Sequence, residues 1–193
     1  SQKIKLKMAV YTKINQKEIN IINENFNIDN ITSFKGIKQG IENTNYLLKS
    51  KKKKYILTIF EKRVLQREIP FFMKLMDNLN NSKINCPKPL KTRNNKYLIK
   101  LKNKTACIVS FLEGKDKKIL NINDCYTVGK TIARMHVVTN TMKLNRKNSM
   151  GIKNLKPLLE SIKFKSKKFS NLKVFLNNNL KHCLLYTSDA ADE

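Results

Sequence analysis

The chain has 193 residues and a formal net charge of +26, which allows one or two domains and a sizeable buried core. Thirty-five of its 40 basic residues are lysines, and they are spread through a sequence rich in asparagine and isoleucine, as in proteins of A/T-rich genomes. Because proteins that read nucleic acids rely on arginine and on basic clusters with interleaved aromatic residues, this composition argues against specific nucleic-acid binding.

The first predicted element is a helix that begins after Asn15. Asn15 and Glu18 have the spacing of a capping box, in which two side chains bind free backbone N–H groups at the start of a helix. Ile19, Ile22 and Phe26 follow at helical spacing and predict one buried face. We expect this helix to pack on the sheet formed by the residues that come next.

Residues 34–62 predict three strands, joined first by a glycine-bearing turn and then by a solvated tip of four lysines. Gly36 and Gly40, two of only five glycines in the chain, lie near the first turn with Asn43 and Asn45. Glycine weakens a strand, so we expect it where φ is positive or a ligand comes close. The amides of such a turn can donate to phosphate oxygens. The G-x-x-x-G spacing leads from strand to strand, unlike a Walker A or Rossmann loop, and an ordinary hairpin stays open as the alternative.

The third of these strands places its side chains on alternating faces of the sheet. Thr58 and Lys62 share one face, whereas Leu57, Ile59 and Glu61 share the other. Residues 55–60 as a whole predict a buried strand.

A helix begins near Pro70, which suits a first helical turn. The apolar stripe expected for this helix consists of Phe72, Leu75, Met76 and Leu79.

Two strands follow over residues 97–101 and 105–111, and the second is the more apolar.

The rest of the chain has only helical patterns. One helix is capped near Asn123 or Asp124, and a last pattern begins near Pro157. The layout is therefore a five-stranded antiparallel sheet with two helices, a linker at residues 110–115, and then helices only. This is the order of a nucleotide-binding lobe joined by a hinge to a helical lobe.

Several segments together resemble the homoserine kinases of the aminoglycoside phosphotransferase and choline kinase-like family. The similarity runs in order from Met8 to about Leu180. It is carried by residues 8–12, 35–37, 40–47, 55–64, 69–72, 85–87 and 111–114. The resemblance implies an α+β, protein kinase-like fold and transfer of the γ-phosphoryl group of ATP to the hydroxyl of L-homoserine, with Mg²⁺ as the metal.

The same resemblance implies a set of nucleotide contacts. The triphosphate would lie under Gly36, Gly40, Asn43 and Asn45. The adenine would bind backbone groups of a hinge formed by Ser110, Phe111 and Leu112.

At Thr58 the chain departs from the wider family, which has a lysine or arginine there paired with a helix glutamate. Phe72 falls near the expected place of that glutamate. Lys62, on the same face as Thr58, is a candidate substitute with Glu68 as its partner. A solvated surface pair is the alternative for these two residues.

The family's catalytic loop, His-Gly-Asp-x-x-x-x-Asn, and the further aspartate that binds the metal are not found in the sequence. His136 precedes two valines and His182 precedes Cys183, so neither histidine begins this loop. We therefore predict no catalytic residue and no metal ligand in these residues. We expect them to be a catalytically silent part of a longer kinase.

The predicted boundaries follow from this layout: a nucleotide-binding lobe at residues 8–109, the hinge at 110–115, and part of a helical lobe at 116–183. Residues 1–7 and 184–193 differ in character from the rest, and we expect them to be non-native. Four cysteines without a C-x-x-C pair argue against zinc and disulfides. With no apolar run of about 20 residues and no signal peptide, a cytoplasmic protein without membrane contact is expected.

Two alternatives to homoserine phosphorylation stay open. One keeps the fold but changes the acceptor to choline, methylthioribose or an aminoglycoside. The other is a non-enzymatic basic module that binds nucleic acid, whose binding would fall steeply with salt.

Overall fold

The computed structural model describes residues 10–38, 42–61, 64–146, 152–161 and 171–179. The chain divides into two compact units, Ser1–Asn145 and Arg146–Glu193. The sheet, both helices packed on it and the linker all belong to the first unit. The predicted boundary at residues 110–115 stays a prediction.

The first unit is built on a five-stranded sheet in which every neighbouring pair is antiparallel. The spatial order is β1-β2-β3-β5-β4, so the last two strands form a hairpin whose second strand lies next to β3. This confirms the predicted five-stranded antiparallel sheet. The strands are β1 (Ile31–Ile37), β2 (Thr44–Ser50), β3 (Lys54–Ile59), β4 (Leu98–Leu101) and β5 (Lys104–Ser110).

Helix α1 (Gln16–Asn25) covers one face of the sheet. Asn15 and Glu18 form the predicted capping box, with Asn15 N–H donating to Glu18 Oε2 at 2.8 Å. Ile19, Ile22 and Phe26 are all buried, as their spacing predicted. Their partners in the core include Tyr46, Leu48, Tyr55, Leu57, Ile59 and Ile108.

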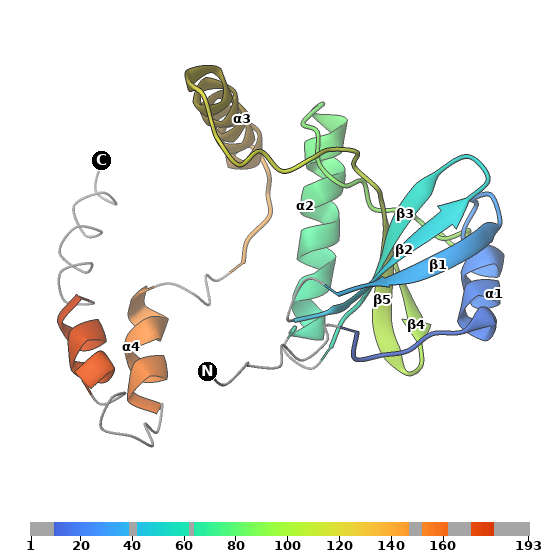
Figure 1. The fold of residues 1–193 in the computed structure, drawn as a ribbon, viewed down its shortest axis with the longest axis horizontal. Helices are drawn as coiled ribbons and strands as arrows, with labels where there is room; N and C mark the ends of the chain where they lie inside the picture. The colour runs from blue at the N-terminus through green and yellow to red at the C-terminus, as the bar shows by residue number, and fades with distance from the viewer. Residues whose placement is uncertain (1–9, 39–41, 62–63, 147–151, 162–170, 180–193) are drawn as a thin grey trace. The chain divides into compact units, whose positions relative to one another are not determined.

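Helix α2 (Ile69–Asn81) packs on the opposite face of the sheet, as Figure 1 shows. Pro70 lies in its first turn, as expected. The predicted stripe was only partly right, because the residues buried most deeply are Ile69, Met73 and Leu79. Ile69 and Met73 contact Cys107 and Val109 of β5, whereas Phe72 and Met76 lie at the edge of this cluster.

Helix α3 (Ile122–Asn140) begins one turn earlier than predicted. Its N-cap is Asn121, not Asn123 or Asp124, because Asp124 is the third helical residue and closes a capping box with Asn121. Within the described part of the chain, no residue of α3 is buried.

In the second unit, helix α4 (Ile152–Ser161) contains Pro157 inside it rather than at its start. Proline removes one backbone donor in the second turn, and the helix forms despite this cost. A further helical segment covers residues 171–179. Among the described residues, the pattern predicted as one last helix therefore corresponds to two helical segments. None of the helices in the described ranges has the length and apolar character needed to cross a membrane.

Candidate functional site

The candidate site begins with two side chains on the α2 face of the sheet. Asn45 of β2 lies directly opposite Thr58 of β3, and Thr58 Oγ1 donates to Asn45 Oδ1 at 2.8 Å. An asparagine amide has one acceptor oxygen and an NH₂ group with two donors. Because Thr58 occupies the oxygen, the two N–H donors of Asn45 are left for another partner.

Asn43 is oriented in the same way. Its Oδ1 accepts a hydrogen bond from the backbone N–H of Glu61 at 3.3 Å, which again leaves the amide NH₂. Asn43 directly precedes β2 and Asn45 is its second residue, and each has its side-chain oxygen held by a residue in or just after β3. Both are half-buried. Two such oriented NH₂ groups at this end of β2 can donate to the oxygens of an anion such as phosphate.

Gly36 has a packing role that the sequence did not reveal. An added Cβ would lie 2.9 Å from Val10 Cγ2, and φ is outside the positive range that favours glycine. Gly36 pairs with Tyr46, whose side chain is buried on the α1 face, so this missing side chain is on the side away from Asn45. The predicted reason for Gly36, a positive φ or an approaching ligand, is therefore not needed. Its contact with a nucleotide stays a prediction, and Gly40 lies outside the described residues.

In the described residues the side-chain hydroxyl of Thr58 donates to Asn45. Lys62, the predicted substitute, lies outside the described residues, so its pairing with Glu68 stays a prediction. Glu68 directly precedes α2. Phe72 packs edge-on against Phe71 with ring centroids 5.4 Å apart, which fits a role in the core.

The predicted hinge is tied to the neighbouring segments through its backbone. Ser110 N–H donates to Lys88 O at 2.9 Å, and Phe111 N–H donates to Lys54 O at 3.3 Å. The Lys54 ammonium group is 2.7 Å from Glu113 and 5.3 Å from the centre of the Phe111 ring. Two of the three hinge N–H groups are therefore already bonded within the protein. Among the described residues no partner is seen for the N–H of Leu112. Adenine binding by the hinge stays a prediction.

The sequence and the fold both match proteins with a known assignment. A family model described as "Phosphotransferase enzyme family" matches residues 33–174, nearly three quarters of the chain. The chain belongs to the phosphotransferase enzyme family.

Curated relatives within this family are named homoserine kinase. One from Paramagnetospirillum magneticum is 39% identical over 156 residues, which is 81% of this chain and 48% of that protein. Another, from Parvibaculum lavamentivorans, is 37% identical over 154 residues, 80% of this chain and 48% of that protein. The chain thus spans about half the length of the curated relatives it matches.

Solved phosphotransferase structures share the fold. A spectinomycin phosphotransferase in complex with ADP and spectinomycin has a TM-score of 0.60 at 19% identity, covering 93% of this chain and 58% of that one. A microcompartment-associated aminopropanol kinase has a TM-score of 0.56 at 13% identity, covering 75% of this chain and 48% of that one. These likenesses confirm the predicted fold class.

This phosphotransferase-family chain also contains a buried polar network that sequence reasoning missed. Thr44 at the start of β2 is fully buried, and its Oγ1 donates to Glu61 Oε1 at 2.8 Å. Thr12 Oγ1 donates to the same oxygen at 2.6 Å, and Lys104 Nζ donates to Glu61 Oε2. Burial by itself raises the pKa of Glu61, but the hydrogen bonds from Lys104, Thr12 and Thr44 and the charge of Lys104 together lower it.

One signal for this network was present in the sequence. Strand alternation placed Glu61 on the same face as Leu57 and Ile59, and both of these are buried. A carboxylate on a buried face requires hydrogen-bonding partners. The partners were not identifiable, because they come from segments far away along the chain.

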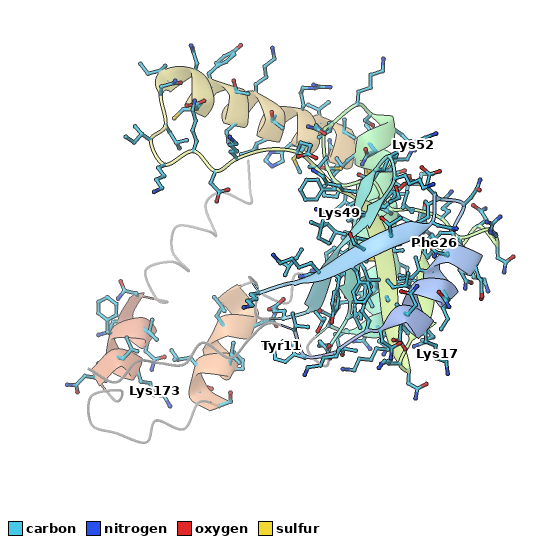
Figure 2. The ribbon with its side chains drawn as sticks, turned by 45° about the vertical axis from the view of Figure 1, so that its right-hand side comes forward. Tyr11, Lys17, Phe26, Lys49, Lys52 and Lys173 are labelled. Carbon is cyan, nitrogen blue, oxygen red and sulfur yellow. The ribbon has the colours of Figure 1, made fainter. Side chains whose placement is uncertain are left out.

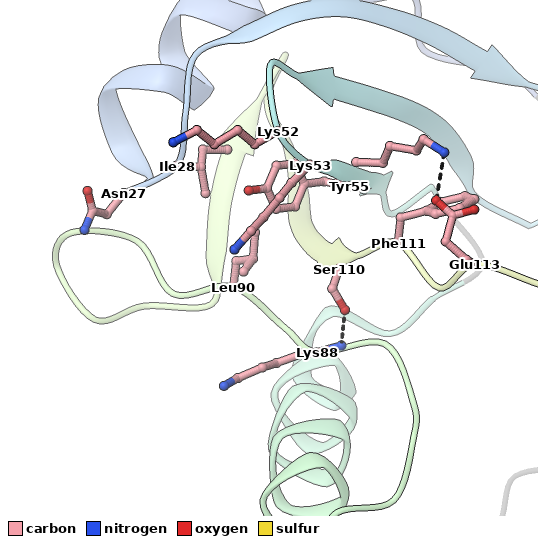
Figure 3. Close-up of a pocket in the computed structure, with 11 residues that line it drawn as sticks. Asn27, Ile28, Lys52, Lys53, Tyr55, Lys88, Leu90, Ser110, Phe111 and Glu113 are labelled. Atoms are coloured by element: carbon pink, nitrogen blue, oxygen red, sulfur yellow. Dashed lines mark hydrogen bonds and ion pairs between the residues drawn. The ribbon is translucent and has the colours of Figure 1, made fainter.

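A pocket of about 550 Å³ lies behind the hinge, between the lysine-rich hairpin tip and the loop after α1 (Figure 3). Tyr55, one of its lining residues, packs in the α1 core, so the pocket lies on the face opposite Asn45 and Thr58. Burial and the charge of Asp29 raise the pKa of Tyr55. The pocket borders the hinge but is separate from the asparagine-bearing face.

Figure 2 labels residues near both ends of the sheet. Lys52 is at the hairpin tip next to the hinge, whereas Tyr11 lies near the opposite end, where its N–H donates to Thr44 Oγ1 at 3.0 Å.

Among the described residues, no three histidine, cysteine or acidic side chains are grouped so that they would hold a metal ion. The described residues therefore do not fit a magnesium site.

Proposed function

We propose that the protein transfers the γ-phosphoryl group of ATP to the hydroxyl of L-homoserine. The support for the acceptor is the identity of 37–39% to relatives named homoserine kinase over four fifths of the chain. The support for the nucleotide is the pair of oriented amides, Asn43 and Asn45, at the beginning of β2 and just before it. Because the chain spans about half of those relatives, the proposal concerns the whole protein that includes these residues.

The proposed contribution of these residues is positioning and charge stabilisation, which dominate phosphoryl transfer. Asn43 and Asn45 donate to the phosphate oxygens and hold the phosphate chain along the sheet. The Leu112 N–H and the hinge carbonyls bind the adenine edge, because the N–H groups of Ser110 and Phe111 are already bonded within the protein. Magnesium, where bound, would neutralise charge on the transferring group. The described residues provide no group of ligands for it.

A different acceptor is the main competing proposal. Choline, methylthioribose or an aminoglycoside would fit the same fold, and the two neighbours named above act on other small molecules by their names. Those neighbours are less than 20% identical and support the fold alone. The relatives named homoserine kinase favour homoserine, and no observation favours the nucleic-acid alternative.

The test uses the protein translated from the complete gene, incubated with ATP and with each acceptor in turn. We expect phosphohomoserine to form faster than phosphorylated choline, methylthioribose or spectinomycin. Asn45→Ala is expected to weaken ATP binding, whereas Asn94→Ala, an exposed asparagine in a turn, serves as the matched control. Equal loss in both variants, or no phosphorylation of homoserine, would contradict the proposal.

A further inference from the structure

Four segments of the chain meet at the Glu61 carboxylate. Thr12 precedes α1, Thr44 begins β2 and Lys104 begins β5, while Glu61 itself lies two residues after β3. Thr12, Thr44 and Lys104 all donate to this one side chain, which is 11% exposed. Lys104 Nζ also donates to Thr12 Oγ1 at 2.7 Å, which closes the group.

Thr44 is the member through which this group reaches the candidate site. Its hydroxyl accepts the N–H groups of Tyr11 and Thr12 at 3.0 and 3.1 Å and donates to Glu61, so its full bonding capacity is used. Thr44 lies between Asn43 and Asn45 in the sequence. Because strand side chains alternate, fixing Thr44 on the α1 face also fixes the direction of Asn45 on the other face, whereas Asn43 directly precedes the strand.

The backbone of Glu61 makes a second link. Its N–H donates to Asn43 Oδ1 at 3.3 Å, so the residue that holds Thr44 through its carboxylate also orients Asn43 through its main chain. Side chains that bind a ligand are effective when their own positions are fixed by such supporting hydrogen bonds.

We propose that Glu61 is a positioning residue for the nucleotide site, acting through Thr44 on Asn43 and Asn45. This inference rests on the proposed ATP binding, and it assigns to Glu61 no contact with the nucleotide itself. The competing explanation is a buried ion pair with a purely structural role. Against it, buried ion pairs do not by themselves stabilise a fold strongly.

The chain provides a matched control for that explanation. Glu18 is another carboxylate with little exposure, 7% in its side chain, and it lies 3.9 Å from Lys102. It has no hydrogen bond to Thr44 among those seen in the described residues. Glu18→Gln retains the capping box, because glutamine also serves at that position.

The first measurement is amide hydrogen exchange of the 193-residue chain without nucleotide. In Glu61→Gln and in Thr44→Val, we expect faster exchange at the N–H groups of Tyr11, Thr12 and Glu61. The amides that pair β3 with β5 are expected to keep their wild-type protection, and Glu18→Gln is expected to leave all of these groups unchanged. Unchanged exchange at Tyr11 and Thr12 in both test variants would overturn the inference.

The second measurement is the Kd for ATP. Loss of preorganised donors is expected to raise this Kd about tenfold in Glu61→Gln and Thr44→Val, while Glu18→Gln and Thr44→Ser, which keeps the hydroxyl, bind as the wild type does. If the wild type binds ATP and Glu61→Gln binds it equally well, the positioning role is wrong and the proposed function stands. If the wild type binds no ATP, the proposed nucleotide site is wrong, and Glu61 then has no positioning role for a nucleotide. Hydrogen exchange still shows in that case whether Glu61 fixes Thr44.

Discussion

The polar residues of the candidate site are each oriented by a neighbour before any ligand is considered. Thr58 is the clearest case, because it stands where a lysine or arginine was expected and instead holds the amide oxygen of Asn45. Thr58 and Asn45 are therefore a neutral pair that presents the amide N–H groups of Asn45. Directed N–H groups depend more strongly on geometry than a point charge does.

Gly36 provides a test of packing at the level of one methyl group. In Gly36→Ala the new Cβ meets Val10 Cγ2 at 2.9 Å, so Val10 must shift. We expect a loss of about 1 kcal/mol in the free energy of unfolding, measured by urea denaturation. Gly114→Ala is the control, because no atom lies within 4 Å of its added Cβ. Equal effects of the two substitutions, or no recovery when Val10→Ala is added to Gly36→Ala, would show that this contact is not the cause.

The charge of Glu61 predicts how stability depends on pH. Its pKa in the folded protein lies below the ordinary value of 4.5, so between these two values the unfolded chain binds more protons than the folded one. The stabilising contribution is therefore complete above pH 4.5 and is lost as the pH falls through the folded pKa. Lys104, the first residue of β5, is the cation that donates to Glu61.

Glu61→Gln removes this titration. Urea unfolding of the wild type from pH 6 down to about pH 3 is expected to show a steeper loss of stability than the variant shows over the same range. Parallel curves for the two proteins would mean that Glu61 titrates alike in the folded and unfolded states.

At the level of helices, the value of a cap depends on what the helix buries. Asn15→Ala removes the cap of α1, whose Ile19, Ile22 and Phe26 lie in the core, and we expect a loss of about 1 kcal/mol in overall stability. Asn121→Ala removes the equivalent cap of α3, which has no buried residue in the part of the chain that the structure describes. This second change is expected to lower helix content with little effect on unfolding of the sheet.

Two probes separate these outcomes. Far-UV circular dichroism reports helix content. Tyrosine fluorescence reports chiefly the sheet, because Tyr46 and Tyr55 are buried there and lose that environment on unfolding, whereas Tyr126 of α3 is already exposed, and the chain has no tryptophan. If Asn121→Ala lowered the midpoint of tyrosine unfolding as much as Asn15→Ala, then α3 would contribute to the same cooperative unit.

Elements that depend on local patterns were predictable, and those that depend on distant contacts were not. The capping box at Asn15 and the antiparallel strands follow from spacing within a few residues. The start of α3 was misplaced because Asn121, Asn123 and Asp124 are all good capping residues, and sequence alone does not rank them. The core side of α2 was shifted for a similar reason, since nearly every position from Ile69 to Met76 is apolar.

The site was harder to predict than the fold. Asn43 and Asn45 were predicted as candidates, but their orientation depends on Thr58 of β3 and on Glu61, two residues after that strand. The partners of Glu61 lie 49, 17 and 43 residues away in the sequence, at Thr12, Thr44 and Lys104. Gly36 was interpreted through φ and ligand approach, whereas the structure explains it by a contact with Val10, 26 residues away.

At the scale of the whole molecule, the residues proposed to bind the nucleotide are distinct from those expected to catalyse phosphoryl transfer. The first unit contains the oriented amides and the predicted hinge, which are the proposed nucleotide-binding features. The 193 residues contain no His-Gly-Asp sequence, the expected source of the residue that orients the attacking hydroxyl. Without such a general base, the rate falls by a factor of roughly 100 to 10,000.

We therefore predict that the 193-residue chain binds ATP without turning it over. ATP at 100 times its Kd stabilises a binding-competent protein by about 2.7 kcal/mol, which raises the melting temperature measurably. In the same preparation, an assay with ATP and L-homoserine is expected to yield no phosphohomoserine above background, whereas the product of the complete gene yields it. Steady turnover by the 193 residues would show that their own side chains supply the base. An unchanged melting temperature with ATP would show that the oriented amides and the hinge do not by themselves make a nucleotide site.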